Sequence, residues 1–243
     1  MMVKRELNIK YSGSQAGKWW LLIYPLVTLS VYTLISHYLF KIQATGAPYV
    51  LFAFSGIIPW MFFSSIVINS ANAFPANRDL IKKSYFPKAI LIMVKMLVSM
   101  LEMGFTLSIY FLLIVFYHFP LTYKVLLLPL AIGFNILIAF SFALWVSILS
   151  IRFKDVFQAI PLLVNLMLWL TPVFYPASII PARVLPIAYC NPMAFVIDLY
   201  RFSLIGATIQ VQYGLVPLAV TLTLFVSGIV FFIKREDHLV ENI

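Results

Sequence analysis

Four stretches of this chain are apolar over roughly 20 residues or more and contain no Asp, Glu, Lys, Arg or His. They are residues 49–74, 125–149, 156–174 and 213–233. A helix needs about 20 mostly apolar residues to cross the hydrocarbon core of a bilayer. Because 63% of the chain is hydrophobic and only 10% is charged, a soluble core of this size could not bury its apolar surface. We therefore predict an all-α integral membrane protein.

Two further apolar runs bring the predicted number of spans to six. Residues 19–40 contain only His37, and residues 89–117 contain Lys95 and Glu102. Residues 176–201 are also apolar, but prolines interrupt them and the uninterrupted part is too short for a comfortable span. We interpret 176–201 as a re-entrant or interfacial helical hairpin on the outer side, before the last span. The whole chain then forms one transmembrane domain.

The basic residues predict the orientation of the spans. With both termini in the cytoplasm, most of the 17 Lys and Arg residues lie in inner segments, as the positive-inside rule expects. The inner ones are Lys4, Arg5, Lys10, Lys18, Arg78, Lys82, Lys83, Lys88, Arg152, Lys154, Lys234 and Arg235. The outer ones are Lys41, Lys124, Arg183 and Arg201. The net charge of +9 is thereby explained by topology, and we expect no binding of nucleic acid.

No motif for catalysis or for a cofactor stands out. Residues 13–18 resemble a phosphate-binding loop, but three residues rather than four separate the glycines, and Trp19 follows Lys18 where Ser or Thr is needed. The histidines are scattered, and Cys190 is the single cysteine. We expect a transport subunit that is not an enzyme, with any ATP hydrolysis in another chain.

Lys95 and Glu102 are the charges inside a predicted span. A carboxylate at that depth costs about 2.5–3.5 kcal/mol on insertion scales, so it needs a structural or functional reason. The two residues lie two turns apart on the same helix face. They form either a polar contact within the bundle or a proton relay or substrate contact.

Aromatic residues gather in the first, second and fifth predicted spans. Flat rings stack on the apolar faces of sugars, so these residues are candidates for lining a glycan path. The alternative is packing against lipid and the aromatic belt of the interface. The candidates are Tyr24, Tyr32, Trp60, Phe62, Phe63, Trp169, Phe174 and Tyr175.

The connector at residues 75–88 is basic, has apolar residues at roughly helical spacing, and faces the cytoplasm in this topology. It is either a short surface helix that docks a soluble partner or an ordinary basic loop.

Six ordered motifs resemble the type-2 ABC transporter permeases that export bacterial polysaccharides, of the Wzm and KpsM kind. They are KYSGSQAGKWWLLIYPL (10–26), SGIIPWMFFSS (55–65), LIKKSYFPK (80–88), RFKDV (152–156), TPVFYP (171–176) and NPM (191–193). The similarity extends from Lys10 to about Gly206. Family members usually have a longer amphipathic helix before the first span, so residues 1–18 are expected to be a short interface segment or a truncated one.

The resemblance implies a homodimer in the bacterial inner membrane with two separate ATPase subunits, which bind ATP and magnesium. The connector then corresponds to the coupling helix, and the RFKDV segment lies near the same interface. The residues expected to contact the ATPase are Arg78, Asp79, Leu80, Lys82, Lys83, Tyr85, Phe86, Arg152 and Asp155. The implied cargo is a lipid-linked glycan of O-antigen, capsule or teichoic acid type.

The basic flank before the first span is a candidate for attracting the lipid diphosphate, through Arg5, Lys10 and Lys18. An ion-coupled flippase, with Glu102 as proton carrier, is the alternative function. A membrane-bound transferase is disfavoured because the outer ionisable residues, including Asp198 and Arg201, look dispersed in the sequence.

Overall fold

The computed structural model describes residues 2–11, 17–35, 46–77, 81 and 87–236 of the chain, and within these ranges every regular element is a helix. The helices are α1 (Met2–Tyr11), α2 (Trp20–Thr33), α3 (Tyr49–Ala71), α5 (Ala89–Phe116), α6 (Leu128–Arg152), α7 (Lys154–Leu170), α8 (Leu185–Ala188), α9 (Pro192–Ile205) and α10 (Leu215–Glu236). Short 3₁₀ turns precede or connect them at Gly17–Trp19, Pro75–Asn77, Tyr123–Leu127, Ala177–Ile179 and Val211–Tyr213.

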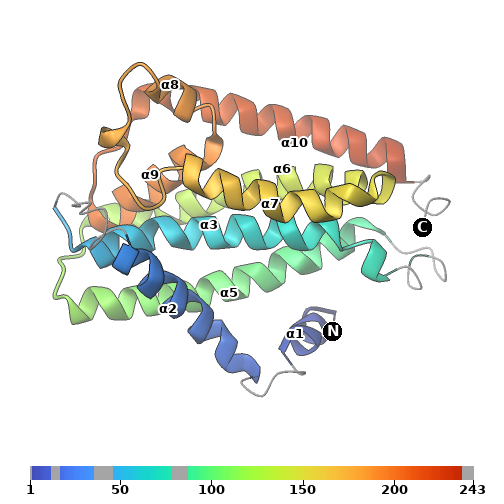
Figure 1. The fold of residues 1–243 in the computed structure, drawn as a ribbon, viewed down its shortest axis with the longest axis horizontal. Helices are drawn as coiled ribbons and strands as arrows, with labels where there is room; N and C mark the ends of the chain where they lie inside the picture. Colours follow the sequence, from blue (N-terminus) through green and yellow to red (C-terminus); the bar gives the residue numbers. More distant parts are fainter. Residues whose placement is uncertain (1, 12–16, 36–45, 78–80, 82–86, 237–243) are drawn as a thin grey trace.

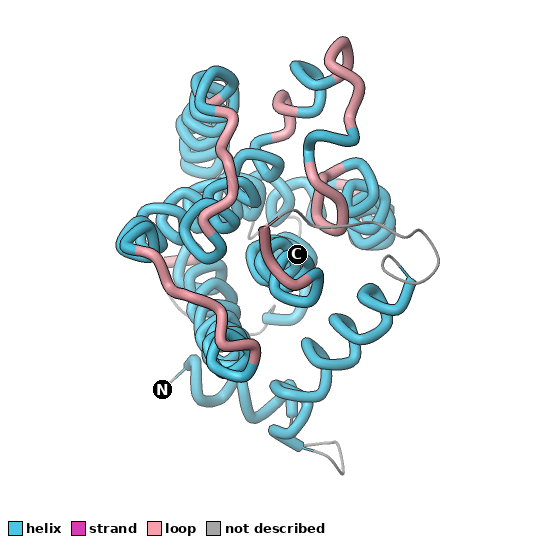
Figure 2. The backbone as a smooth tube through the Cα atoms, turned by 90° about the vertical axis from the view of Figure 1, so that its left-hand side faces the viewer, coloured by secondary structure: helices cyan, strands magenta, loops and turns pink. Residues whose placement is uncertain are grey.

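The helix α3 forms the centre of the bundle, which Figure 2 shows end-on. It packs against α2, α5, α6, α7 and α9. Most of its side chains are buried, including Leu51, Phe54 and Ile66. A helix that is apolar on all sides must be surrounded by other apolar surfaces, and α3 meets that condition with protein alone.

Four helical segments are long and apolar enough to cross a membrane: Tyr49–Ala71, Ala89–Phe116, Tyr123–Arg152 and Val211–Arg235. Their bounds lie within a few residues of the predicted second, third, fourth and sixth spans. The all-helical membrane architecture is therefore confirmed at this level, on length and composition.

The fifth predicted span is shorter in the structure than the sequence suggested, and the first is described only in part. The regular part of α2 ends at Thr33, and residues 36–40 of the predicted span lie outside the described residues. The helix α7 ends at Leu170, where the prolines at 172 and 176 cannot continue a helical hydrogen-bond ladder. The helix thus ends at Leu170, before the carboxyl end of the predicted span 156–174.

The ends of the helices alternate between two sides of the molecule (Figure 1). The end of α3, the start of α5, the α6–α7 junction and the end of α10 lie at one side. The start of α3, the end of α5 and the short helix α8 lie at the other. This alternation is the arrangement that a multi-pass chain requires.

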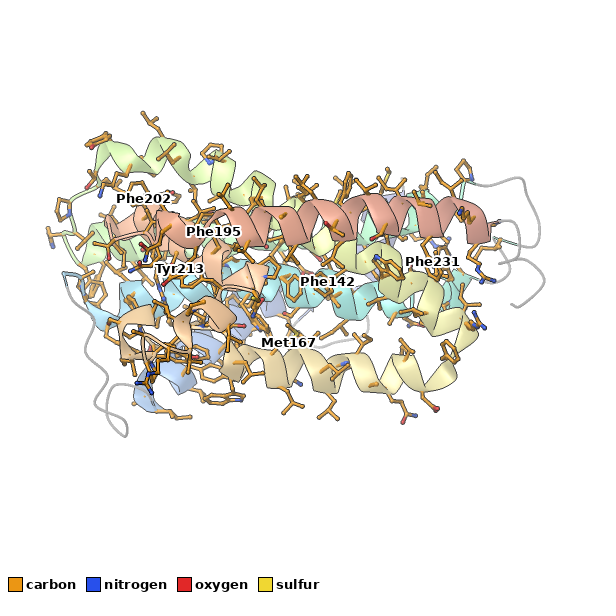
Figure 3. The ribbon with its side chains drawn as sticks, turned by 90° about the horizontal axis from the view of Figure 1, so that it is seen from above. Phe142, Met167, Phe195, Phe202, Tyr213 and Phe231 are labelled. Carbon is orange, nitrogen blue, oxygen red and sulfur yellow. The ribbon has the colours of Figure 1, made fainter. Side chains whose placement is uncertain are left out.

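The outer faces of α7 and α10 carry many exposed apolar side chains, as Figure 3 shows. On α7 they include Leu162, Leu166 and Trp169, and on α10 they include Leu215 and Val226. Water would penalise such surfaces, whereas lipid or a second apolar protein surface would not.

The predicted hairpin at 176–201 contains two short helices rather than a span. Asn191 caps α9 by accepting a hydrogen bond from the backbone N–H of Met193 at 3.0 Å, and Pro192 occupies the first helical position. Gly206 ends α9 with φ of 70°, a left-handed conformation that glycine adopts without steric cost. These signals fix the position of the side chains on α9.

Candidate functional site

A cavity of about 420 Å³ lies between α1, α2, α3 and α5. Its lining combines aromatic and aliphatic side chains with hydroxyl, amide and charged groups. The first group includes Trp20, Tyr24, Phe62 and Met103, and the second includes Lys10, Ser65, Asn69, Ser99 and Glu102. Small-molecule sites usually have such a mixed lining, in which apolar surface provides area and a few polar groups fix orientation.

Two ion pairs hold α1 against α5 at this cavity. Lys10 pairs with Glu102 at 2.5 Å, and Glu6 pairs with Lys95. The hydroxyl of Tyr11 also donates to Glu102, at 2.8 Å. Burial, together with the hydrogen bond to this carboxylate, raises the pKa of Tyr11 above its usual range. The hydroxyl therefore stays protonated and remains a donor at neutral pH.

The expected proximity of Lys95 and Glu102 on one face of α5 does not lead to a contact between them. Each pairs instead with a residue of α1, about 90 positions away in the sequence. Residues four apart in α1 meet residues seven apart in α5, because each spacing keeps both side chains on one helix face. The charges inside the third span thus attach the amino-terminal helix.

A polar strip crosses the wall formed by α3 and α5. The hydroxyls of Ser65 and Ser99 are 2.9 Å apart, and the amide nitrogen of Asn69 donates to Ser65 at 3.1 Å. Asn69 lies one helical turn after Ser65 on α3, so their side chains share a face. The strip places hydroxyl and amide groups in the cavity between otherwise apolar helices.

The three basic residues predicted to attract the lipid diphosphate differ in their surroundings. Arg5 is exposed on α1. Lys10 is 39% exposed but engaged with Glu102. Lys18 lies in the 3₁₀ turn before α2, and its side chain is outside the described residues.

The aromatic candidates fall into three groups. Tyr24 and Phe62 line the cavity, and Tyr24 is largely exposed. Trp60, Phe63 and Phe174 are buried in the core, with Phe174 stacked on the half-buried ring of Tyr32 at 4.0 Å between centroids. Trp169 is exposed on α7, and the hydroxyl of Tyr175 donates to its backbone carbonyl. Tyr24 and Trp169 are therefore the candidates whose rings are most exposed.

Most residues of the predicted ATPase contact lie outside the described residues. These are Arg78, Asp79, Leu80, Lys82, Lys83, Tyr85 and Phe86. Arg152 and Asp155 are described, and both are exposed at the α6–α7 junction. Asp155 occupies the first turn of α7, where a carboxylate is favoured by the helix dipole.

The structure also contains a buried charged cluster that the sequence interpretation missed. Arg201, which the sequence places in the hairpin on the outer side of the membrane, is 3% exposed. Its guanidinium donates to the carbonyls of Val173 at 2.6 Å and Tyr175 at 3.4 Å, and lies 3.8 Å from the ring centroid of Phe52. Burial lowers the pKa of Arg201 to about 10, which still leaves it charged at neutral pH.

Asp198 lies three residues before Arg201 on α9 and is 5% exposed. It accepts a hydrogen bond from the hydroxyl of Tyr189. The spacing of Asp198 and Arg201 in an otherwise apolar run was the available signal, because charges three apart on a helix share a face. The cluster joins α3, the 171–176 segment, α8 and α9, so it fixes the hairpin against the bundle.

The chain belongs to the ABC-2 type transporter family, whose model matches residues 1–205. Its relatives include permeases whose names refer to the export or transport of polysaccharides. The O-antigen export system permease protein RfbA of Klebsiella pneumoniae is 26% identical over 99% of this chain and 93% of that protein. RfbA of Myxococcus xanthus is 27% identical over 100% and 94%. The polysialic acid transport protein KpsM of Escherichia coli is 23% identical over 98% and 93%. The resemblance inferred from the six motifs is confirmed.

Proposed function

We infer that this chain is the transmembrane permease subunit of an ABC transporter that exports a lipid-linked, O-antigen-like polysaccharide across the bacterial inner membrane. The supporting observation is the similarity, over nearly the whole chain, to permeases named for O-antigen export. Helices long and apolar enough to span a bilayer agree with a multi-pass permease.

ATP and magnesium bind to a separate ATPase subunit, present in two copies beneath a permease homodimer. The proposed contact consists of the connector at 78–87 together with Arg152 and Asp155. The end of α3, the start of α5 and the α6–α7 junction lie at the same side of the molecule, which supports a shared docking surface (Figure 1). Nucleotide binding shifts the permease between conformations if the ATPase contacts differ between them.

The exposed faces of α2 and α7 support the homodimer and a path for the glycan. Tyr24 and Val27 on α2, and Trp169 on α7, are more than half exposed. Aromatic faces at such a surface stack on successive sugars without selecting one of them. This tolerance suits processive movement of a polymer.

Arg5, Lys10 and Lys18 provide a basic flank for the diphosphate of the lipid carrier. Each basic residue near an anionic membrane surface contributes about 1 kcal/mol of attraction. This membrane role, rather than nucleic-acid binding, accounts for the positive charge of the amino-terminal segment.

The test is to delete the gene and to follow the polysaccharide. We expect the surface glycan to disappear while its lipid-linked form accumulates on the cytoplasmic side, and a plasmid copy to restore export. Export should stop when the ATPase subunit carries an inactive nucleotide site. The ion-coupled flippase, with Glu102 as proton carrier, is the correct reading if export continues without ATP hydrolysis and stops when the proton gradient collapses.

A further inference from the structure

The cavity between α1, α2, α3 and α5 contains hydrogen-bond acceptors without donors. Oε1 of Glu102 accepts both the ammonium of Lys10 and the hydroxyl of Tyr11. Its other oxygen, Oε2, accepts no hydrogen bond from the part of the chain that the structure describes. Ionised carboxylates have room for about four donors, so Glu102 retains capacity for a ligand.

Two further acceptors lie in the same wall. The amide nitrogen of Asn69 donates to Ser65, and among the described residues no donor reaches the amide oxygen of Asn69. Pro25 has no backbone N–H, so the carbonyl of Leu21 lacks the donor that a regular helix would supply. Leu21, Pro25, Asn69 and Glu102 all line the cavity. A ligand that matches this surface brings several hydrogen-bond donors.

The remaining lining provides flat apolar surface. Trp20, Tyr24 and Phe62 line the cavity, from α2 and α3. Aromatic rings attract the C–H faces of sugars, while the hydroxyls around a sugar ring supply donors at its edge. The Lys10–Glu102 pair is neutral overall, so the lining does not favour a strongly charged ligand.

We propose that each protomer binds one neutral sugar ring in this cavity, with sugar hydroxyls donating to Glu102 and Asn69 and a ring face lying against the aromatic wall. All of the lining residues belong to one chain, and Tyr24 is the one that the cavity shares with the proposed glycan path. That the physiological ligand is a sugar of the exported glycan rests on the proposed function, whereas the chemistry of the cavity does not.

The helix α1 completes the site. It contributes Lys10 and Tyr11 to the lining, and the two ion pairs to α5 hold it in place. Loss of those pairs would remove one wall of the cavity.

A labelling experiment on the full chain in phospholipid nanodiscs tests the proposal. Cys190 is the single cysteine, so a Cys190→Ser, Ser64→Cys variant carries one thiol, in the cavity wall. We measure its alkylation by N-ethylmaleimide with glucose, galactose, mannose, N-acetylglucosamine and N-acetylgalactosamine. We expect at least one sugar to slow labelling about threefold at about 100 mM, which corresponds to a dissociation constant of about 50 mM.

The unaltered chain is the control, because its exposed Cys190 lies outside the cavity lining and its labelling should not respond to sugar. Asn69→Leu in the Ser64→Cys background should abolish protection. Asn72→Leu, on an exposed position outside the cavity, should preserve it. The Asn72→Leu variant separates loss of the site from a general effect of a leucine in this region.

Equal labelling with and without every sugar overturns the site. Protection by inorganic phosphate rather than by sugars also overturns it, because the cavity would then be an anion site centred on Lys10. The proposed function is judged separately, by ATP-dependent export in cells. Export without sugar protection leaves the permease assignment standing, and sugar protection without export leaves the cavity assignment standing.

Discussion

The guanidinium of Arg201 lies 3.8 Å from the ring centroid of Phe52, which joins α9 to the central helix α3. The same guanidinium donates to the carbonyls of Val173 and Tyr175, directly after the end of α7. A single buried cation therefore connects three parts of the chain. It satisfies carbonyls that the broken helix leaves without helical partners.

Replacement of Arg201 by Gln should destabilise the protein by about 1–3 kcal/mol, because it takes the charged donor away from the buried carbonyls of Val173 and Tyr175. The loss of stability is measured by thermal unfolding in detergent, monitored by size-exclusion chromatography. Arg183→Gln is the matched control, since Arg183 is exposed on the same hairpin. Similar melting temperatures for the Arg201→Gln and unaltered proteins would show that the cluster is not structural.

Substitution of Gly56 is the second change that we expect to destabilise the protein. A Cβ at this position would lie 2.6 Å from the carbonyl oxygen of Val173 and 3.1 Å from the guanidinium of Arg201. Gly56→Ala should cost about 1–3 kcal/mol of stability through this overlap. Gly133→Ala on α6 has free space around the new methyl group and should be neutral or stabilising. The melting temperature of the Gly56→Ala variant should be lower than that of the Gly133→Ala variant. Equal melting temperatures would contradict the prediction.

The pairing of Glu6 with Lys95 predicts rescue by charge exchange. Glu6→Lys should release α1 from α5, because two ammonium groups then face each other. We expect export to fall in the Glu6→Lys variant. The double variant Glu6→Lys, Lys95→Glu should restore the contact and at least half of the export that the single variant loses. Lys4→Glu, on an exposed position of α1, is the control for altered helix charge. A double variant no better than the single one would show that the pair does not position α1.

The connector between α3 and α5 carries the fourth prediction. Replacement of Asp79 by Lys and of Phe86 by Ala should abolish export by disrupting the ATPase contact, and permease dimers should remain intact. Cross-linking of the permease and co-purification of the ATPase subunit give the two measurements. Replacement of Thr122 and Tyr123, which lie between α5 and α6, should leave co-purification unchanged, because the end of α5 is at the opposite side of the molecule (Figure 1). Full export by the Asp79, Phe86 variant would exclude this connector as the contact.

The parts of the fold that the sequence predicted well are those set by long apolar runs. The apolar runs locate α3, α5, α6 and α10 to within a few residues, although α6 and α10 continue into the charged residues that follow the runs. The end of α7 was misplaced because Val173 and Phe174 are apolar but follow Pro172, and hydropathy does not register a break in backbone hydrogen bonding.

The partners of the charged residues could not be predicted from the sequence. Lys95 and Glu102 were recognised as unusual, yet their partners Glu6 and Lys10 lie in a different helix, and local spacing carries no information about them. Arg201 was counted on the outer side of the membrane, but the positive-inside rule concerns topology and does not predict whether a side chain is buried. Its burial depends on carbonyls that only the folded 171–176 segment brings together.

The length of α7 has a consequence for the surrounding lipid. Its 17 residues rise about 26 Å, whereas a typical hydrocarbon core is about 30 Å thick. If α7 crosses the bilayer as the proposed fifth span, acyl chains beside it must shorten or tilt to match this helix, and the bilayer becomes thinner there. A locally thin bilayer lowers the barrier that a polar headgroup meets on its way between leaflets, so for the proposed lipid-linked cargo the acyl-chain length of the host membrane would then be a variable of transport.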